Sequence, residues 1–92
     1  MPRLRGKFIT SLVLEGHQHV PGDTRTLDFL ANHKDVVMTG RDEEENLLFR
    51  VRNKSVLTVR PGEWITFVDG DIHNVEIEDD DTINRAYTLE DE

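Results

Sequence analysis

The sequence predicts an α+β fold, a curved, mostly antiparallel sheet of about five to six strands with one short helix packed on it. Two observations lead to this prediction. Short apolar segments rich in β-branched residues recur along the chain, several of them with strand-like alternation, and one amphipathic helical stripe follows the first of them. A run of strands after a single helix is typical of α+β folds, and an up-and-down partial barrel is the nearest variant.

Length and composition indicate a single domain covering residues 1–92. The chain is 36% hydrophobic and 33% charged, so its core must be small and its surface well solvated. It has no cysteine, which excludes disulfides, thiolate zinc sites and cysteine nucleophiles. No apolar run is long enough to span a bilayer and the first residues do not resemble a secretory signal, so we expect a soluble intracellular protein. Residues 1–6 are expected to form a flexible basic arm and residues 90–92 a flexible acidic tail.

The amino-terminal half begins with an apolar segment that we interpret as the first strand, Lys7–Leu14, with apolar residues on both faces. Glycines and a proline then predict a loop over Glu15–Thr24. Apolar residues spaced three and four apart predict a helix from Arg25 to His33. Asp23 or Thr24 is expected to cap that helix by accepting a free backbone N–H of its first turn.

The middle of the chain reads as strands joined by polar turns. Val36–Thr39 is a brief strand, and the charged residues 41–46 form the loop after it. Leu47–Arg52 alternates between apolar and polar residues, so one face is buried and the other wet. Asn53-Lys54 suits a tight turn, and Ser55–Arg60 returns as a strand with Leu57 and Val59 facing inward.

The segment Val59–Ile77 is predicted to be a β-hairpin that organises the rest of the chain. Pro61-Gly62 marks a turn before it, and Asp69-Gly70-Asp71 marks the turn between its two strands. It contains the only tryptophan, Trp64, which we expect to be core or hairpin cover. After an acidic loop, Thr82 is expected to cap a last helical turn or strand that covers a sheet edge.

The charge is unevenly distributed. The formal net charge is −8, and from Asp69 onward there are ten acidic residues and a single basic one, Arg85. This balance argues against direct nucleic-acid binding over the acidic face, because nucleic acids are bound mainly through cationic side chains. The acidic residues serve either solubility alone or recognition of a basic protein surface. The candidate partner-binding residues are Asp69, Asp71, Glu76, Glu78, Asp79, Asp80 and Asp81.

A divalent metal site is the alternative hypothesis for the histidines. His17 and His19 would project to one side of an extended backbone, and His73 could approach from the sheet. His17-Gln18-His19 with Asp23 resembles the first motif of the cupin family, and the segment from Gly62 to His73 resembles the second. The resemblance implies that His17, His19, Asp23 and His73 hold the metal in a small jelly roll. The other interpretation is that these are solvated side chains, in keeping with the helix predicted after Asp23, where a cupin has strand.

A second resemblance covers nearly the whole chain. FITSLVLEG, LDFLANHKD, LLFRVRNKSVLTVRPGEWI, VDGDI and INRAYTLED resemble successive parts of a family of small tailed-bacteriophage proteins with mostly unassigned functions. That family shares a PGD-W-I segment, in which Glu63 replaces the usual aspartate here. The resemblance implies a phage origin and an α+β fold, and it carries no catalytic residues.

These observations favour a non-enzymatic function without a cofactor. We expect a small acidic phage accessory protein in the cytoplasm of the infected host cell. It would bind, and thereby inhibit, a host defence or nucleic-acid-binding protein through the acidic surface, without contacting membrane. The alternatives are a cupin-like metal-binding enzyme or small-molecule binder, and a structural component of the virion that forms homo-oligomers.

Overall fold

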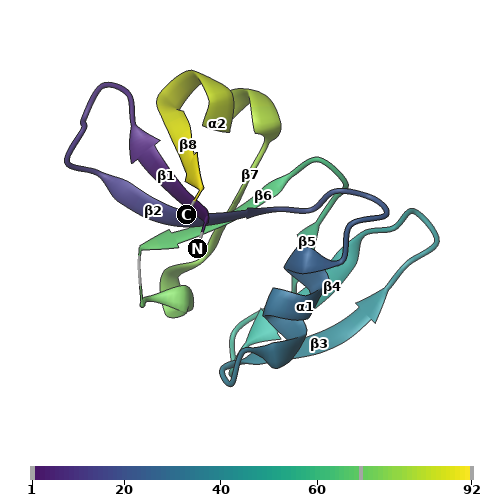
Figure 1. The fold of residues 1–92 in the computed structure, drawn as a ribbon. Coiled ribbons are helices and arrows are strands. Elements are labelled where there is room, and N and C mark those ends of the chain that lie inside the picture. The colour runs from purple at the N-terminus through teal and green to yellow at the C-terminus, as the bar shows by residue number, and fades with distance from the viewer. Residues whose placement is uncertain (1, 69, 92) are drawn as a thin grey trace.

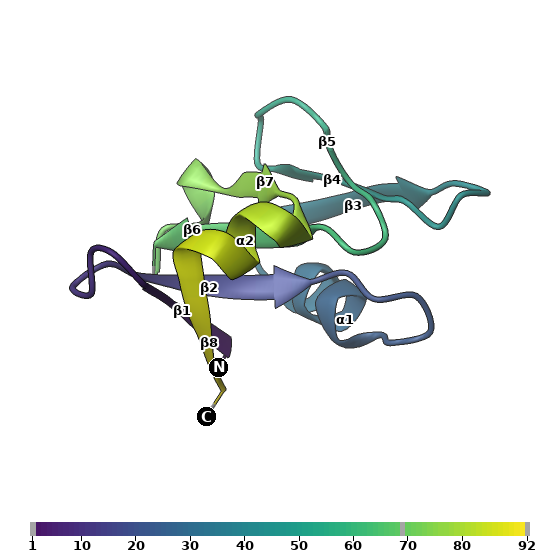
Figure 2. The same cartoon turned by 90° about the horizontal axis from the view of Figure 1, so that it is seen from above.

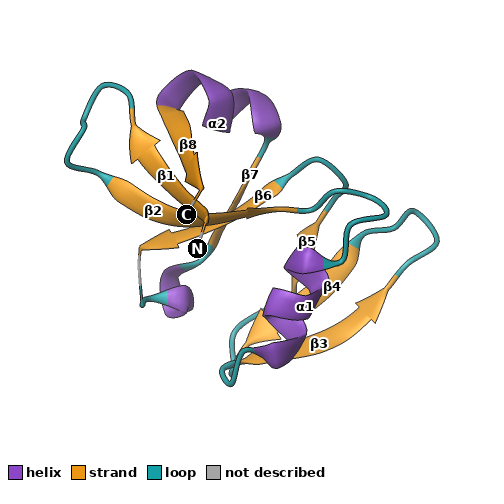
Figure 3. Ribbon diagram, viewed as in Figure 1, coloured by secondary structure: helices purple, strands orange, loops and turns teal. Residues whose placement is uncertain are grey.

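The computed structural model describes residues 2–68 and 70–91, which contain eight strands and two α-helices. Figure 1 shows their arrangement, and Figure 3 shows that strands make up most of the regular structure. The elements in chain order are β1 (Pro2–Gly6), β2 (Val13–Gln18), α1 (Arg25–Asn32), β3 (Val36–Arg41), β4 (Leu47–Val51), β5 (Leu57–Val59), β6 (Trp64–Val68), the 3-10 helix η1 (Ile72–Asn74), β7 (Glu76–Glu78), α2 (Asp80–Ala86) and β8 (Tyr87–Asp91).

The strands form two antiparallel sheets, not the one sheet that the sequence predicts. The larger has five strands in the order β7-β6-β2-β1-β8, and the smaller has three in the order β3-β4-β5. The α+β class is therefore confirmed, whereas the single sheet with one helix is wrong. The reason is that the chain turns away from β2 through α1, pairs β3, β4 and β5 among themselves, and only then returns to β2 with β6.

The two faces of β6 carry separate hydrophobic cores. Ile65 and Phe67 point into the larger core, which also contains Leu30 of α1 and the buried side chains of β3, β4 and β5. Trp64 points to the other face and packs with buried residues of β1 and α2. Accordingly, α1 and α2 lie well apart, one beside the smaller sheet and the other beside β1 and β8 (Figures 1 and 2). Every residue from Trp64 to Phe67 is buried because both faces of this strand are covered.

The amino-terminal strand prediction is wrong. Most of the predicted strand Lys7–Leu14 is the turn between β1 and β2, closed by hydrogen bonds from Gly6 N–H to Leu12 O and from Leu12 N–H to Ile9 O. Phe8 is 86% exposed and Ile9 63% exposed, so this apolar segment is not core. β-branched residues favour strands only weakly by themselves, and here the pairing of the flanking segments, β1 and β2, places them in a turn.

Residues 2–6 of the predicted flexible arm at residues 1–6 form strand β1, which pairs with β2 on one side and β8 on the other, and residue 1 lies outside the described part of the chain. Arginines alternate with a fully buried Leu4, as expected for a strand with one covered face. Residues 90 and 91 of the predicted acidic tail belong to β8, which pairs with β1. Residue 92 lies outside the described part of the chain.

The helix and strand predictions after residue 24 fare better. Helix α1 is confirmed, and it begins where the backbone N–H of Arg25 donates to Asp23 Oδ1; Thr24 occupies the cap position without a side-chain capping bond. Strand β4 shows the predicted alternation, with Leu47, Phe49 and Val51 buried. Strand β3 is longer than predicted, and β5 is shorter.

The predicted hairpin Val59–Ile77 is present, but its second strand begins later than predicted. β6 pairs antiparallel with β7, but the chain forms the short helix η1 first and becomes a strand only at Glu76. The closing segment contains both a helix, α2, and an edge strand, β8. Asp79 caps α2 by accepting a hydrogen bond from the N–H of Thr82, so the cap predicted at Thr82 is three residues too late. Within the described residues, no helix is long and apolar enough to cross a membrane.

We expect Phe49→Ala to destabilise the protein by about 3–5 kcal/mol, because truncating a large buried side chain removes its transfer free energy and leaves a cavity. Phe49 is 0% exposed in the larger core. Val37→Ala on β3 is the matched control; this side chain is 44% exposed, and we expect a change within about 0.5 kcal/mol. Urea unfolding followed by Trp64 fluorescence measures both, and equal stabilities of the two variants would contradict the core assignment.

Candidate functional site

Five of the predicted acidic residues follow one another along β7 and the first turn of α2. We call them the acidic segment: Glu76, Glu78, Asp79, Asp80 and Asp81. Glu76 and Glu78 lie on the same side of β7, because Ile77 between them packs against the larger core. Glu76, Asp79 and Asp81 are exposed, whereas Glu78 and Asp80 are half-buried. The structure therefore brings these carboxylates together around the open end of the β6–β7 hairpin.

Two members of the acidic segment already have structural partners. Asp79 caps α2, and hydrogen bonds from the side chain and the backbone N–H of Thr82 lower the pKa of Asp79 below its ordinary value. Asp80 Oδ1 accepts hydrogen bonds from Trp64 Nε1 at 2.9 Å and from Gln18 Nε2 at 3.2 Å. Asp80 therefore connects α2 to β6 and β2, a role that no pattern in the acidic run could indicate.

The other two predicted acidic residues do not belong to this segment. Asp71 lies where η1 begins, at the closed end of the β6–β7 hairpin, whereas the acidic segment continues from the open end. Its carboxylate accepts a hydrogen bond from Asn74 Nδ2 at 2.7 Å. Asp69 lies outside the described residues.

The structure places the four predicted metal ligands in different surroundings. His19 Nε2 donates to the backbone oxygen of Glu45 at 2.6 Å, and His73 lies 3.3 Å from Asp35. Asp23 binds the guanidinium of Arg25 through several hydrogen bonds, which lower the pKa of Asp23. Among the described residues, no group of three or more histidine, aspartate or glutamate side chains is placed to hold a metal ion. The cupin-like ligand set is therefore not assembled.

His17 instead forms a buried pair with Glu15. Its Nε2 lies 2.5 Å from Glu15 Oε2, and the exposed fractions of the two side chains are 10% and 6%. Because a carboxylate can only accept, the ring nitrogen donates this hydrogen bond. One face of the imidazole stacks on Phe29 of α1, with ring centroids 3.9 Å apart. This pair fixes the orientation of the imidazole ring.

Sequence reasoning missed the Glu15–His17 pair because it assigned both residues to a loop. The signal that could have found them is their spacing of two, since residues two apart in a strand share one face. The segment from Val13 to Gln18 does not look like a strand in the sequence, because it has a glycine, Gly16, near its centre and a polar residue, Gln18, at its end. Gly16 is required there: an added Cβ would lie only 2.4 Å from Leu4 Cδ1.

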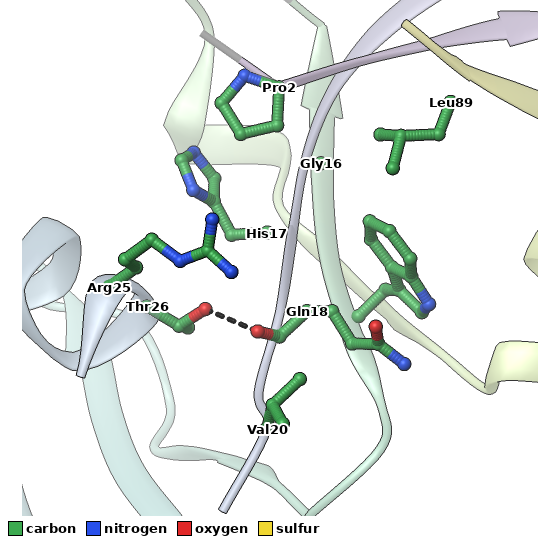
Figure 4. A pocket seen from close by; sticks show the side chains of 9 residues that line it. Pro2, Gly16, His17, Gln18, Val20, Arg25, Thr26 and Leu89 are labelled. Carbon is green, nitrogen blue, oxygen red and sulfur yellow. Dashed lines mark hydrogen bonds between the residues drawn. The ribbon is translucent and has the colours of Figure 1, made fainter. Parts of the chain in front are cut away.

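The His17 ring also lines a cavity of about 150 Å³ beside β2. Gln18, Thr26, Trp64 and Leu89 contribute to its wall, which mixes polar and apolar groups. Figure 4 shows His17 and Leu89 on opposite sides of β2, with the Thr26 hydroxyl donating to the carbonyl oxygen of Gln18 at 2.6 Å. A liquid water occupies about 30 Å³, so a molecule of only a few heavy atoms would fit.

No protein-family model, curated protein or solved structure matches this chain. Two features of the structure bear on function: the acidic segment, and the Glu15–His17 pair with its cavity.

We expect stability to fall more steeply below about pH 4 in the native protein than in an Asp79→Asn variant. The pKa of Asp79 in the folded state lies below its ordinary value of 3.8. Its stabilising effect is therefore complete above that pH and is lost as the pH falls towards the folded-state pKa. Asparagine also caps helices but does not titrate in this range.

Thermal unfolding between about pH 6 and pH 2, followed by circular dichroism, measures this difference. Asp81→Asn is the control, because it removes a neighbouring carboxylate that is not the cap. If Asp79→Asn and Asp81→Asn reduced the acid sensitivity equally, the cap would not be its source.

Proposed function

We propose that this protein acts by binding another protein, and that the acidic segment contacts a basic surface of that partner. The observation that carries the proposal is the state of the Glu76 and Asp81 carboxylates. Both are exposed, and among the described residues no lysine or arginine lies within ion-pair distance of either. Charges of this kind cost little to leave in water and steer a cationic partner into contact.

The division of roles within the acidic segment supports the same proposal. Asp79 caps α2 and Asp80 bonds it to β6 and β2, so the exposed carboxylates beside them lie on a fixed frame. A binding surface on a rigid element loses less conformational freedom when the partner docks. The biological setting that agrees with the phage resemblance is inhibition of a host defence or nucleic-acid-binding protein in the cytoplasm of the infected cell. A structural role in the virion is the alternative setting for the same contact.

The test is affinity capture from a bacterial lysate by the immobilised protein, eluted with a salt gradient. We expect captured proteins with basic surfaces, eluted as the salt rises, because salt screens exposed charges. The double variant Glu76→Lys with Asp81→Lys should lose them, since it reverses the local charge without touching Asp79 or Asp80.

Glu43→Lys with Glu44→Lys is the matched control. It changes the net charge by the same amount at two exposed positions on the β3–β4 loop, and it should retain the partner. The proposal fails if nothing is captured, or if both double variants bind equally well.

A second candidate function is small-molecule binding or acid–base chemistry at the Glu15–His17 pair. The specific observation is that a carboxylate orients a nine-tenths-buried imidazole that lines a cavity. Such a pair holds the ring in one tautomer and orientation, as catalytic histidines require. The size and mixed wall of the cavity favour a ligand of a few heavy atoms that carries a hydroxyl, amide or carboxylate group.

We expect a library of such fragments to contain molecules that change both the His17 ring resonances and Trp64 fluorescence, because both residues line the cavity. His17→Gln should abolish these responses. His73→Gln is the control, because His73 lies beside Asp35 and away from the cavity. A library without a fragment that affects both probes would exclude this function.

A further inference from the structure

Strand β8 ends the larger sheet, and among the residues that the structure describes no strand pairs with its outer side. Two backbone hydrogen bonds show which of its groups face outward. Gly6 N–H donates to Leu12 O, so Gly6 faces β2, whereas Lys7 N–H donates to Ala86 O on the β8 side. Successive residues of a strand direct their N–H and C=O groups to alternate sides, so Arg3 and Arg5 face β8.

Arg5 lies opposite Thr88 and Arg3 opposite Glu90 in the register of β1 with β8. These are therefore the hydrogen-bonded pairs, and the backbone groups of Tyr87, Leu89 and Asp91 point away from the sheet. An unpaired row of this kind is a ready template for another strand.

The other sheet edges are less suitable for pairing. β5 and β7 have three residues each, and β3 carries a bulge between Met38 and Gly40. Short strands and bulges are the usual means of protecting an edge. β8 has five residues in unbroken register with β1. Helix α2 does not cover this edge, because its buried Ile83 packs on Leu4 and Trp64 towards the middle of the sheet.

We propose that β8 pairs antiparallel with β8 of a second copy of this chain, with Leu89 opposite the partner's Leu89 on a two-fold axis. In this register the outward N–H and C=O groups of Leu89 meet their own counterparts, and Tyr87 lies opposite the partner's Asp91. The two five-stranded sheets become one continuous sheet.

The side chains on both faces of the sheet fit this register. On the α2 face, Leu89 lies next to the fully buried Leu4 and is itself 51% exposed, and the pairing covers it with the partner's Leu89. On the opposite face, Arg3 is followed by Glu90, then by the partner's Thr88 and the partner's Arg5. No like charges are opposed in that row, and opposite charges across strands are stabilising.

The acidic segment does not oppose this contact. Glu76 and Glu78 lie on β7, the far edge of the same sheet, and Asp80 is bonded to β6 and β2, so the acidic segment does not lie on β8. The dimer therefore does not depend on the proposed partner-binding function. An interface of one strand pair and a leucine contact is small, so we expect a reversible dimer.

Sedimentation velocity over a range of protein concentrations tests the dimer, and Leu89→Pro is the decisive variant. Proline removes the outward N–H of residue 89 and no bond to β1, so the folded monomer should persist in circular dichroism and Trp64 fluorescence. We expect the dimer Kd to rise at least about tenfold. Val37→Ala on strand β3 is the control, because it changes an exposed side chain in the smaller sheet and should leave the dimer Kd unchanged.

The register has its own test, because the chain has no cysteine of its own. A Leu89→Cys variant should oxidise to a covalent dimer, since directly opposite residues have Cα atoms about 5.5 Å apart, within disulfide range. Thr88→Cys should do so much more slowly, because its opposite residue is the partner's Glu90. A monomer at every concentration, a dimer Kd unchanged in Leu89→Pro, or faster cross-linking at residue 88 would overturn the proposal.

Discussion

The burial of β6 on both faces is the constraint on which the rest of the structure depends. A chain that is only 36% hydrophobic cannot build two independent cores, yet this one has apolar clusters on both sides of a single sheet. β6 joins them, because Ile65 and Phe67 belong to one cluster and Trp64 to the other. Removing the strand would expose both clusters at once, so the two halves of the molecule should unfold together.

β2 extends this coupling to the polar groups. Its residues alternate between the two faces, so Glu15 and His17 lie over the larger core whereas Gln18 reaches Asp80 on the α2 side. On the face of the larger core, Glu15 pairs with His17, and on the α2 face, Asp80 accepts from Gln18. Burying a carboxylate without such a donor would be costly, and this explains why Glu15 occurs together with His17 and why Asp80 accepts from both Trp64 and Gln18. The cavity lies where these two polar networks approach each other along β2.

The sequence predicts the parts of this fold in which local and tertiary preferences agree. The alternation of Leu47, Phe49 and Val51 predicts β4, and the apolar stripe of Arg25–Asn32 predicts α1, because each element buries one apolar face and exposes the other. The first eighteen residues misled the prediction for the opposite reason. An apolar run forms the exposed turn, and a segment with a buried glutamate, glycine and histidine forms the central strand. The pairing of Glu15 with His17 and the close approach of Gly16 to Leu4 exist only in three dimensions. Likewise, the acidic run indicated a charged surface, but not that Asp79 and Asp80 are structural.

The strand order also relates the proposed contacts to each other. β7 and β8 are the two edges of one sheet, so Glu76 and Glu78 lie on the edge opposite β8, and Asp80 joins the rest of the acidic segment to β6 and β2. A dimer through β8 would carry two acidic segments related by two-fold symmetry. If a partner presents two basic surfaces at matching separation, the second contact becomes intramolecular, and the overall affinity exceeds that of either contact alone. A monomer with the same carboxylates would bind such a partner more weakly, although each individual contact is unchanged.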